Sequence, residues 1–79
     1  MGLAKTETEI AERAARFLKA ELKRANVTYG ELAERLKKHG FAETKASIAN
    51  KLARATVPAH LFLASLAVIG CQAVQLEDV

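Results

Sequence analysis

The chain has 79 residues, of which 51% are hydrophobic and 27% are charged, and its formal net charge is +3. A chain of this length buries only about 60 to 65% of its unfolded surface, which excludes a second ordinary domain with its own core. We therefore expect residues 1–79 to form a single domain.

The number of cysteines and the hydropathy of the chain indicate where in the cell the protein is expected to lie. Cys71 is the only cysteine, which excludes an internal disulfide and a thiolate zinc cage and is typical of a reducing environment. The longest apolar run, residues 61–71 with Ser65 inside it, is shorter than the roughly 18 residues needed to span a bilayer. Met1–Lys5 lacks the apolar segment of a secretory signal. The sequence therefore predicts a cytoplasmic protein of bacterial type without a membrane helix.

The charge is distributed unevenly along the chain. Residues 27–55 carry six Lys or Arg against three Glu, whereas residues 56–79 carry only Glu77 and Asp78. A basic middle third is typical of contact with an anionic partner, although a margin of a few charges also occurs on an ordinary solvated surface.

The first predicted element is an amphipathic helix over residues 8–25. Its apolar positions mostly follow one another at spacings of three or four residues, as a helix with one buried face requires. These positions are Ile10, Ala14, Phe17, Leu18, Leu22 and Ala25. Charged side chains cover the other faces, so we interpret this element as a packing helix.

A second helix is predicted to start after Thr28. Thr28 and Glu31 stand three residues apart and can form a capping box, in which each side chain satisfies a free backbone amide. Leu32 and Leu36 lie on its predicted buried stripe, and Gly40 is a natural residue just beyond its C-terminal end.

Thr44 is predicted to cap a third helix, which is short and basic. Ile48 and Leu52 point toward the core in this interpretation, and the polar and basic side chains remain on the surface.

Val57-Pro58 predicts the start of a fourth helix, because proline is favoured in the first turn and its predecessor avoids helical angles. Residues 61–69 are apolar on nearly every face, which indicates burial in the core or at a subunit interface. Residues 71–79 are expected to be coil.

The sequence contains no recognisable catalytic arrangement. His39 and His60 have no sequence context that would supply a nucleophile beside an oriented base. The glutamates are scattered over helix surfaces, and the four glycines are isolated, so neither a phosphate loop nor a metal-binding spacing is present. We expect no enzymatic activity, no cofactor and no metal.

The order of the second, third and fourth helices is that of a helix-turn-helix module. Residues 28–33, 44–48 and 66–70 resemble the corresponding blocks of the lambda-repressor-like (Cro/repressor type) DNA-binding domains. Residues 26–71 resemble still more closely a bacterial family of small domains of unknown function. The resemblance implies an all-α fold, a small bundle of four to five helices with a helix-turn-helix core over about residues 27–71.

The resemblance also implies binding of double-stranded DNA, as in a transcriptional regulator. Asn50 would pair with an adenine edge, and the basic side chains of the third helix would contact guanine or phosphate. The implied groove-facing set is Thr44, Lys45, Ser47, Asn50, Lys51 and Arg54, with Lys37 and Lys38 as added phosphate contacts. A homodimer forms part of this hypothesis, because a charge of +3 is small for a lone DNA-binding domain.

The alternative hypothesis is a protein-interaction or dimerisation module without nucleic-acid activity. In this alternative the first and fourth helices bind another chain and the basic face only confers solubility. Four side chains of the fourth helix distinguish the two hypotheses: Leu61, Phe62, Leu63 and Ile69. Burial of all four inside the monomer argues against the interaction module, and exposure of several as one patch favours it. A protein that does both is a third interpretation.

Overall fold

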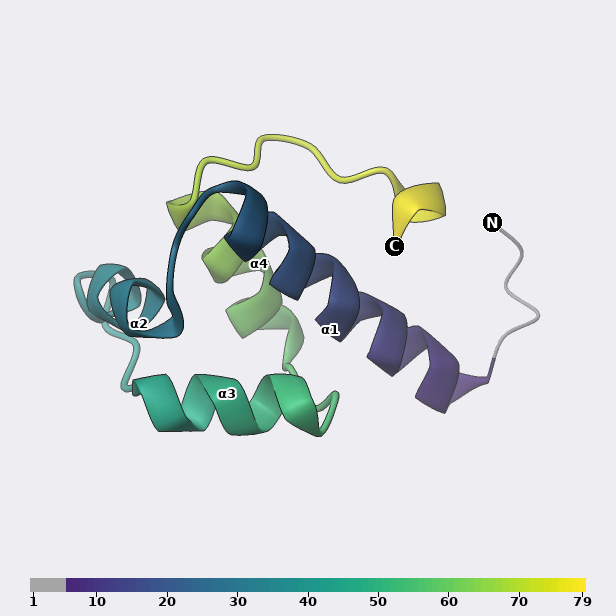
Figure 1. The fold of residues 1–79 in the computed structure, drawn as a ribbon, viewed down its shortest axis with the longest axis horizontal. Helices are drawn as coiled ribbons and strands as arrows, with labels where there is room; N and C mark the ends of the chain where they lie inside the picture. Colours follow the sequence, from purple (N-terminus) through teal and green to yellow (C-terminus); the bar gives the residue numbers. More distant parts are fainter. Residues whose placement is uncertain (1–5) are drawn as a thin grey trace.

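The computed structural model of the chain describes residues 6–79. These residues form four α-helices followed by one short 3-10 helix (Figure 1). The elements are α1 (Glu7–Arg24), α2 (Tyr29–Lys37), α3 (Lys45–Ala53), α4 (Ala59–Val68) and η1 (Leu76–Asp78). No strand occurs in residues 6–79, so the prediction of a small all-helical bundle is confirmed.

None of the helices in the described range is long and apolar enough to cross a membrane. The expectation about a secretory signal concerns Met1–Lys5, which lie outside the described residues.

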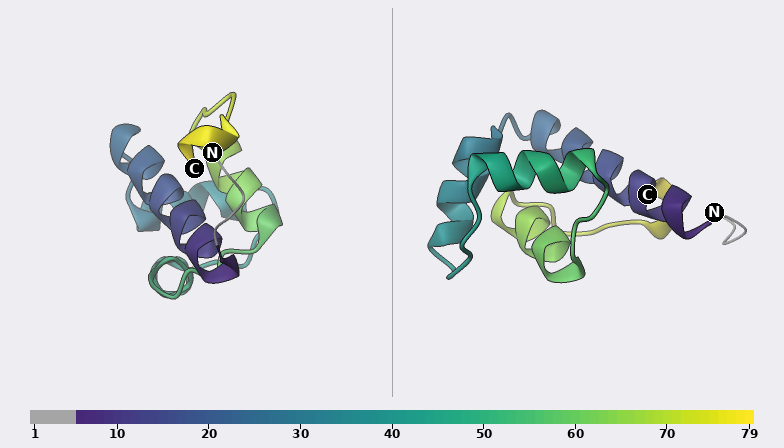
Figure 2. Two further views of the ribbon diagram at one scale, coloured as in Figure 1. Left: turned by 90° about the vertical axis from the view of Figure 1, so that its right-hand side faces the viewer. Right: turned by 90° about the horizontal axis from the view of Figure 1, so that it is seen from below.

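Two helices pack on the same pair of partners. α2 contacts both α3 and α4, and α1 also contacts both. α1 crosses the molecule diagonally in Figure 1, while α3 runs along the lower edge. α2 is seen end-on in that view and lies across the N-terminal end of α3, as the turned view in Figure 2 shows. The consecutive helices α2 and α3 therefore cross one another rather than run side by side.

The core is built from aliphatic side chains of all four helices. Each of the following is at most 3% exposed: Leu18 and Leu22 from α1, Leu32 and Leu36 from α2, Ile48 and Leu52 from α3, and Leu61 and Leu66 from α4. The rings of Phe17 and Phe62, with centroids 6.3 Å apart, add an aromatic contact between α1 and α4. Burying a side chain of this size contributes about 1.5 to 3 kcal/mol each.

The apolar stripe predicted for α1 is correct in its centre and wrong at its ends. Ile10 is 36% exposed and Ala25 is exposed, whereas Ala15 is buried. The N-terminal end of α1 projects past α4 in Figure 1, and Ile10 is not among the side chains that pack against the hydrophobic core.

The N-terminal caps predicted for α2 and α3 are present in the structure. The Thr28 hydroxyl accepts from the Glu31 amide and the Glu31 carboxylate accepts from the Thr28 amide, both at 3.1 Å. The backbone hydrogen bond from Thr28, followed by its side-chain hydrogen bond, lowers the pKa of Glu31. Pro58 differs from the expectation: with ψ at 153° it lies one residue before the first turn of α4 and caps it without a side-chain hydrogen bond.

All four helices end in the same way. Beyond each helix one residue adopts a positive φ, directly after the cap residue in α1, α3 and α4 and two residues after the cap residue Lys38 in α2. The amide that follows this residue donates to a carbonyl oxygen five residues back at 2.9 to 3.2 Å, which is the Schellman arrangement. The residues with positive φ are Asn26 (58°), Gly40 (86°), Ala55 (55°) and Gly70 (86°). Glycine adopts this conformation freely, whereas Ala55 carries a strain of about 1 kcal/mol or more.

The C-terminal segment is coil over residues 71–75, as expected, and ends in the single turn η1. Cys71 and Val74 are half-buried and pack against the core. The segment returns along the upper side of the molecule toward the N-terminal half of α1 (Figure 1).

Candidate nucleic-acid interface

The outward side of α3 carries two of the predicted groove-facing residues, Asn50 and Arg54, together with Ala46 and Ala53, which the prediction did not include. Ala46, Asn50, Ala53 and Arg54 are all exposed, and they recur at spacings of four and three residues, so they form one stripe along the helix. We call these four residues the α3 stripe. It combines two methyl groups with one amide and one guanidinium.

Thr44 and Lys45 are also exposed, at the start of α3. The Thr44 hydroxyl accepts from the Ser47 amide at 3.0 Å, which fixes the first turn of the helix. Lys45 is the first residue of the helix and lies to one side of the α3 stripe.

Ser47 and Lys51 are half-buried and form hydrogen bonds within the chain. Both contact Glu43, whose side chain is 13% exposed. The Ser47 hydroxyl donates to Glu43 Oε1 at 2.7 Å, and Lys51 Nζ donates to Glu43 Oε2 at 2.5 Å. The charge of Lys51 is therefore balanced within the chain.

Burial alone would raise the pKa of Glu43. The hydrogen bonds from Lys51 and Ser47, with the nearby positive charge of Lys51 and a smaller contribution from His60, outweigh that effect and lower the pKa of Glu43 overall. Glu43 is thus held as a carboxylate that ties the connecting loop to α3.

Lys37 and Lys38 are exposed at the C-terminal end of α2, where positive charge is favoured by the helix dipole. The loop that follows them leads directly to Thr44. They therefore stand at the opposite end of this loop from Lys45, and among residues 6–79 no ion pair joins either lysine to another residue.

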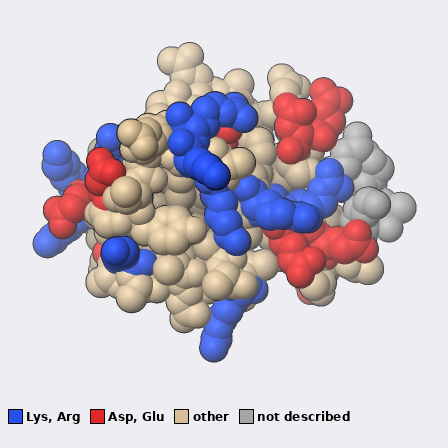
Figure 3. Space-filling model, viewed as in Figure 1, with Lys and Arg blue, Asp and Glu red and all other residues tan. Residues whose placement is uncertain are grey.

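Two basic residues of α1 lie beside Arg54, and the sequence-based prediction did not include them. A groove of about 310 Å³ separates α1 from the C-terminal end of α3, and Arg16, Lys19 and Arg54 all line it, with Glu12 as the one acidic side chain. Figure 3 shows Lys and Arg gathered in a band over α1 on one face, with acidic side chains beside its right-hand end and a second acidic group at the left of the view. A signal was present, since Arg16 and Lys19 stand three residues apart on one face of α1.

The α3 stripe contains side chains that can form directional hydrogen bonds. An amide can donate and accept at once, and a guanidinium can form two parallel hydrogen bonds to a phosphate or a guanine. Within residues 6–79, no group of three His, Cys, Asp or Glu side chains could hold a metal ion.

Fold and surface together define a small all-helical bundle with an exposed, partly basic short helix. Residues 2–74 match the protein family described as "Domain of unknown function (DUF6471)", and the chain belongs to that family. No curated protein and no solved structure matches the chain.

Proposed function

We propose that the protein binds double-stranded DNA through α3, with α2 and α3 acting as a helix-turn-helix pair of the lambda-repressor-like type. The observation that carries the proposal is the α3 stripe: a short helix, capped at its start by Thr44, anchors Ile48 and Leu52 in the core and presents only small or hydrogen-bonding side chains on its open side. Small side chains allow a helix to approach the floor of the major groove closely.

In this proposal base contacts and phosphate contacts come from different elements. Asn50 reads an adenine edge through its amide, and the methyl groups of Ala46 and Ala53 contact thymine methyl groups. Arg54, at the C-terminal end of α3, shares a groove with Arg16 and Lys19, so these three contact the phosphate backbone beside the recognised bases.

Fluorescence titration with mixed-sequence duplex DNA tests this proposal. Binding at about 50 mM salt that weakens steeply at about 200 mM salt is the expected result, since phosphate contacts release counterions. Asn50→Ala should reduce discrimination between duplexes, and Lys23→Gln, which changes an exposed residue of α1 outside the grooves described, is the matched control. Failure to bind at low salt would contradict the proposal.

A second proposal, that the protein is an interaction or dimerisation module, rests on Leu63 alone: the four discriminating side chains in and directly after α4 are neither all buried nor exposed together as one patch. Of the four discriminating side chains, Leu61 is buried, Phe62 and Ile69 are half-buried, and Leu63 is 63% exposed. Sedimentation of the wild type and Leu63→Lys tests it: a wild-type dimer that the substitution dissociates supports this function, and a wild-type monomer at high concentration contradicts it as a self-association module.

A further inference from the structure

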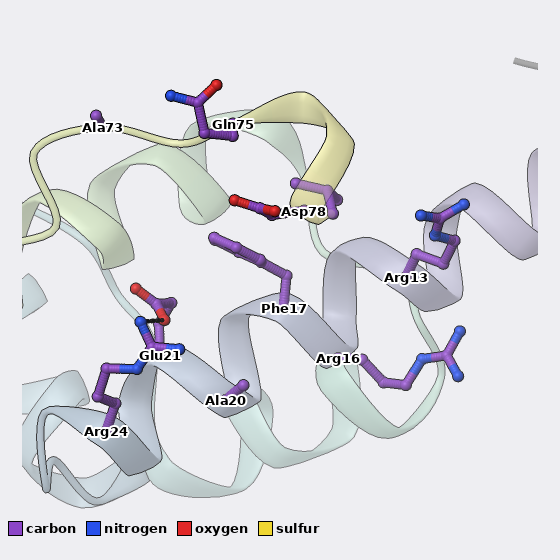
Figure 4. Close-up of a pocket in the computed structure, with 10 residues that line it drawn as sticks. Arg13, Arg16, Phe17, Ala20, Glu21, Arg24, Ala73, Gln75 and Asp78 are labelled. Carbon is purple, nitrogen blue, oxygen red and sulfur yellow. Dashed lines mark ion pairs between the residues drawn. The ribbon is translucent and has the colours of Figure 1, made fainter. Parts of the chain in front are cut away.

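A second groove, larger than the one beside α3, lies between α1 and the C-terminal segment. It has a volume of about 650 Å³ and is open to solvent along one side. Figure 4 shows Arg13 and Arg16 along one half of α1, the ring of Phe17 rising from its floor, and Gln75 and Asp78 on the opposite wall. The two walls thus come from segments far apart in the sequence.

The α1 wall is strongly basic. Arg24 pairs with Glu21 at 3.0 Å, and its side chain is otherwise 77% exposed. Within residues 6–79 the only other ion pair joins Lys51 to Glu43, so Arg13 and Arg16 are not paired with any described carboxylate. Two free guanidiniums on one face of a helix form a site that favours an anionic ligand.

The opposite wall is an extended backbone edge. In the part of the chain from residue 6 to 79, the amides of residues 72–75 make no backbone hydrogen bond. Half-buried Cys71 and Val74 hold this stretch against the core, and the thiol of Cys71 donates to the Ala73 carbonyl at 3.4 Å. The carbonyls of Ala73 and Gln75 accept within the segment, but its free amides can pair with another extended peptide, as in strand addition.

Asp78 shows what kind of group this groove accommodates. Its carboxylate reaches toward the ring of Phe17 between the two walls (Figure 4). It lies beyond ion-pair distance of Arg13 and Arg16, so it occupies part of the groove without neutralising these arginines.

We propose that the groove between α1 and residues 72–79 binds an extended acidic peptide segment of a partner protein. The backbone of the peptide pairs with the edge of residues 72–75, and its carboxylates contact Arg13 and Arg16. A peptide fits better than a nucleic-acid strand, because the free amides of residues 72–75 can pair with the carbonyl groups of an extended peptide, as in strand addition. Arg16 lines both this groove and the one beside α3, so the two proposed sites share that residue, whereas Arg13 lines only this groove and Arg54 does not line it.

Fluorescence anisotropy with a labelled ten-residue peptide of alternating Glu and Thr tests the proposal on the full chain. The acidic peptide should bind saturably at low salt, and the same peptide with Lys in place of Glu should not bind. Arg13→Gln should weaken binding about fivefold, the scale of one charge-assisted hydrogen bond that is partly screened by solvent. Lys23→Gln, outside the groove, should leave it unchanged.

Two further variants examine the other wall. Ala73→Pro removes one free amide and should weaken binding while the circular dichroism remains that of the wild type. Asp78→Asn removes the carboxylate that now occupies the groove and should strengthen binding. Arg54→Ala should have no effect on the peptide, so failure of the DNA-binding proposal and failure of this one are distinguishable.

Two results would overturn the inference. One is an acidic peptide that does not bind, or that binds wild type and Arg13→Gln equally. The other is duplex DNA that displaces the peptide and loses as much affinity as the peptide does in Arg13→Gln, because the groove would then be a phosphate-backbone site.

Discussion

α3 and α4 follow one another along the chain and have similar lengths. In α3 both large apolar side chains are buried and the exposed ones are small or polar, whereas α4 does not follow this rule. α3 is divided cleanly: Ile48 and Leu52 are buried, and its open side carries small and polar groups. α4 is apolar on nearly every face, yet Leu63 is 63% exposed, and the polar Ser65 is fully buried. Apolar composition therefore indicates that a helix lies near a core, but the position of each side chain relative to its neighbours decides whether it is covered.

The largest expected effect is the difference in stability loss between truncating a buried leucine of α3 and truncating the exposed leucine of α4. Leu52→Ala should cost about 2 to 5 kcal/mol of unfolding free energy, because it leaves a cavity at a site that is 3% exposed. Leu63→Ala should change stability by less than about 0.5 kcal/mol. Urea denaturation of both variants measures the difference, and equal losses would contradict the burial assigned to the two helices.

The ends of the two helices should respond in opposite directions. Ala55→Gly, after α3, should stabilise the protein by about 1 kcal/mol, since it relieves a positive φ of 55°. Gly70→Ala, after α4, should destabilise it by about 1 kcal/mol for the converse reason, with φ at 86°. Thermal melts compare the two, and a destabilised Ala55→Gly would mean that the methyl group makes contacts worth more than the strain.

Ser65 offers a sharper test of packing inside α4. Its hydroxyl is buried and has no hydrogen-bond partner among residues 6–79. Ser65→Ala should be neutral or stabilising by up to about 1 kcal/mol, because a buried hydroxyl without a partner loses its hydrogen bonds to water and gains none inside the protein. A clear loss of stability in chemical denaturation would show that this hydroxyl is satisfied in solution.

The smallest expected effect concerns acid stability at the start of α3. Because the pKa of Glu43 is lowered in the folded chain, its stabilising contribution is fully present above the unfolded-state pKa of about 4.3 and is lost as the pH falls through the folded value. Comparison of melts at neutral and acidic pH should therefore show a smaller difference for Glu43→Gln than for the wild type. An identical pH dependence in the two proteins would contradict the stabilising contribution assigned to the Glu43 carboxylate.

Local signals were sufficient for much of the fold. Thr28–Glu31 and Thr44 predicted the starts of α2 and α3, Gly40 predicted the end of α2, and the burial of Leu36, Ile48, Leu52 and Leu66 is confirmed. These features depend on residues within one or two helical turns of each other, which is the range over which sequence spacing is informative.

Contacts between distant segments were not predictable. The pairing of Glu43 with Lys51 joins a loop to a helix, and the approach of Arg16 to Arg54 depends on how α1 packs on α3. Similarly, the guanidinium of the exposed Arg35 donates to the Val68 carbonyl at the end of α4 at 3.1 Å. Tertiary packing determines all three, and none leaves a periodic signal in the sequence.

The most direct test of the proposed DNA interface is the salt dependence of duplex binding in Arg16→Gln and Arg54→Gln, with Lys23→Gln as the control. If both arginines contact phosphate, the slope of log Kobs against log salt should become shallower by about 0.9 for each, and the control should keep the wild-type slope. Wild-type slopes in both arginine variants would place the phosphate contacts elsewhere and contradict the interface formed by α1 and α3.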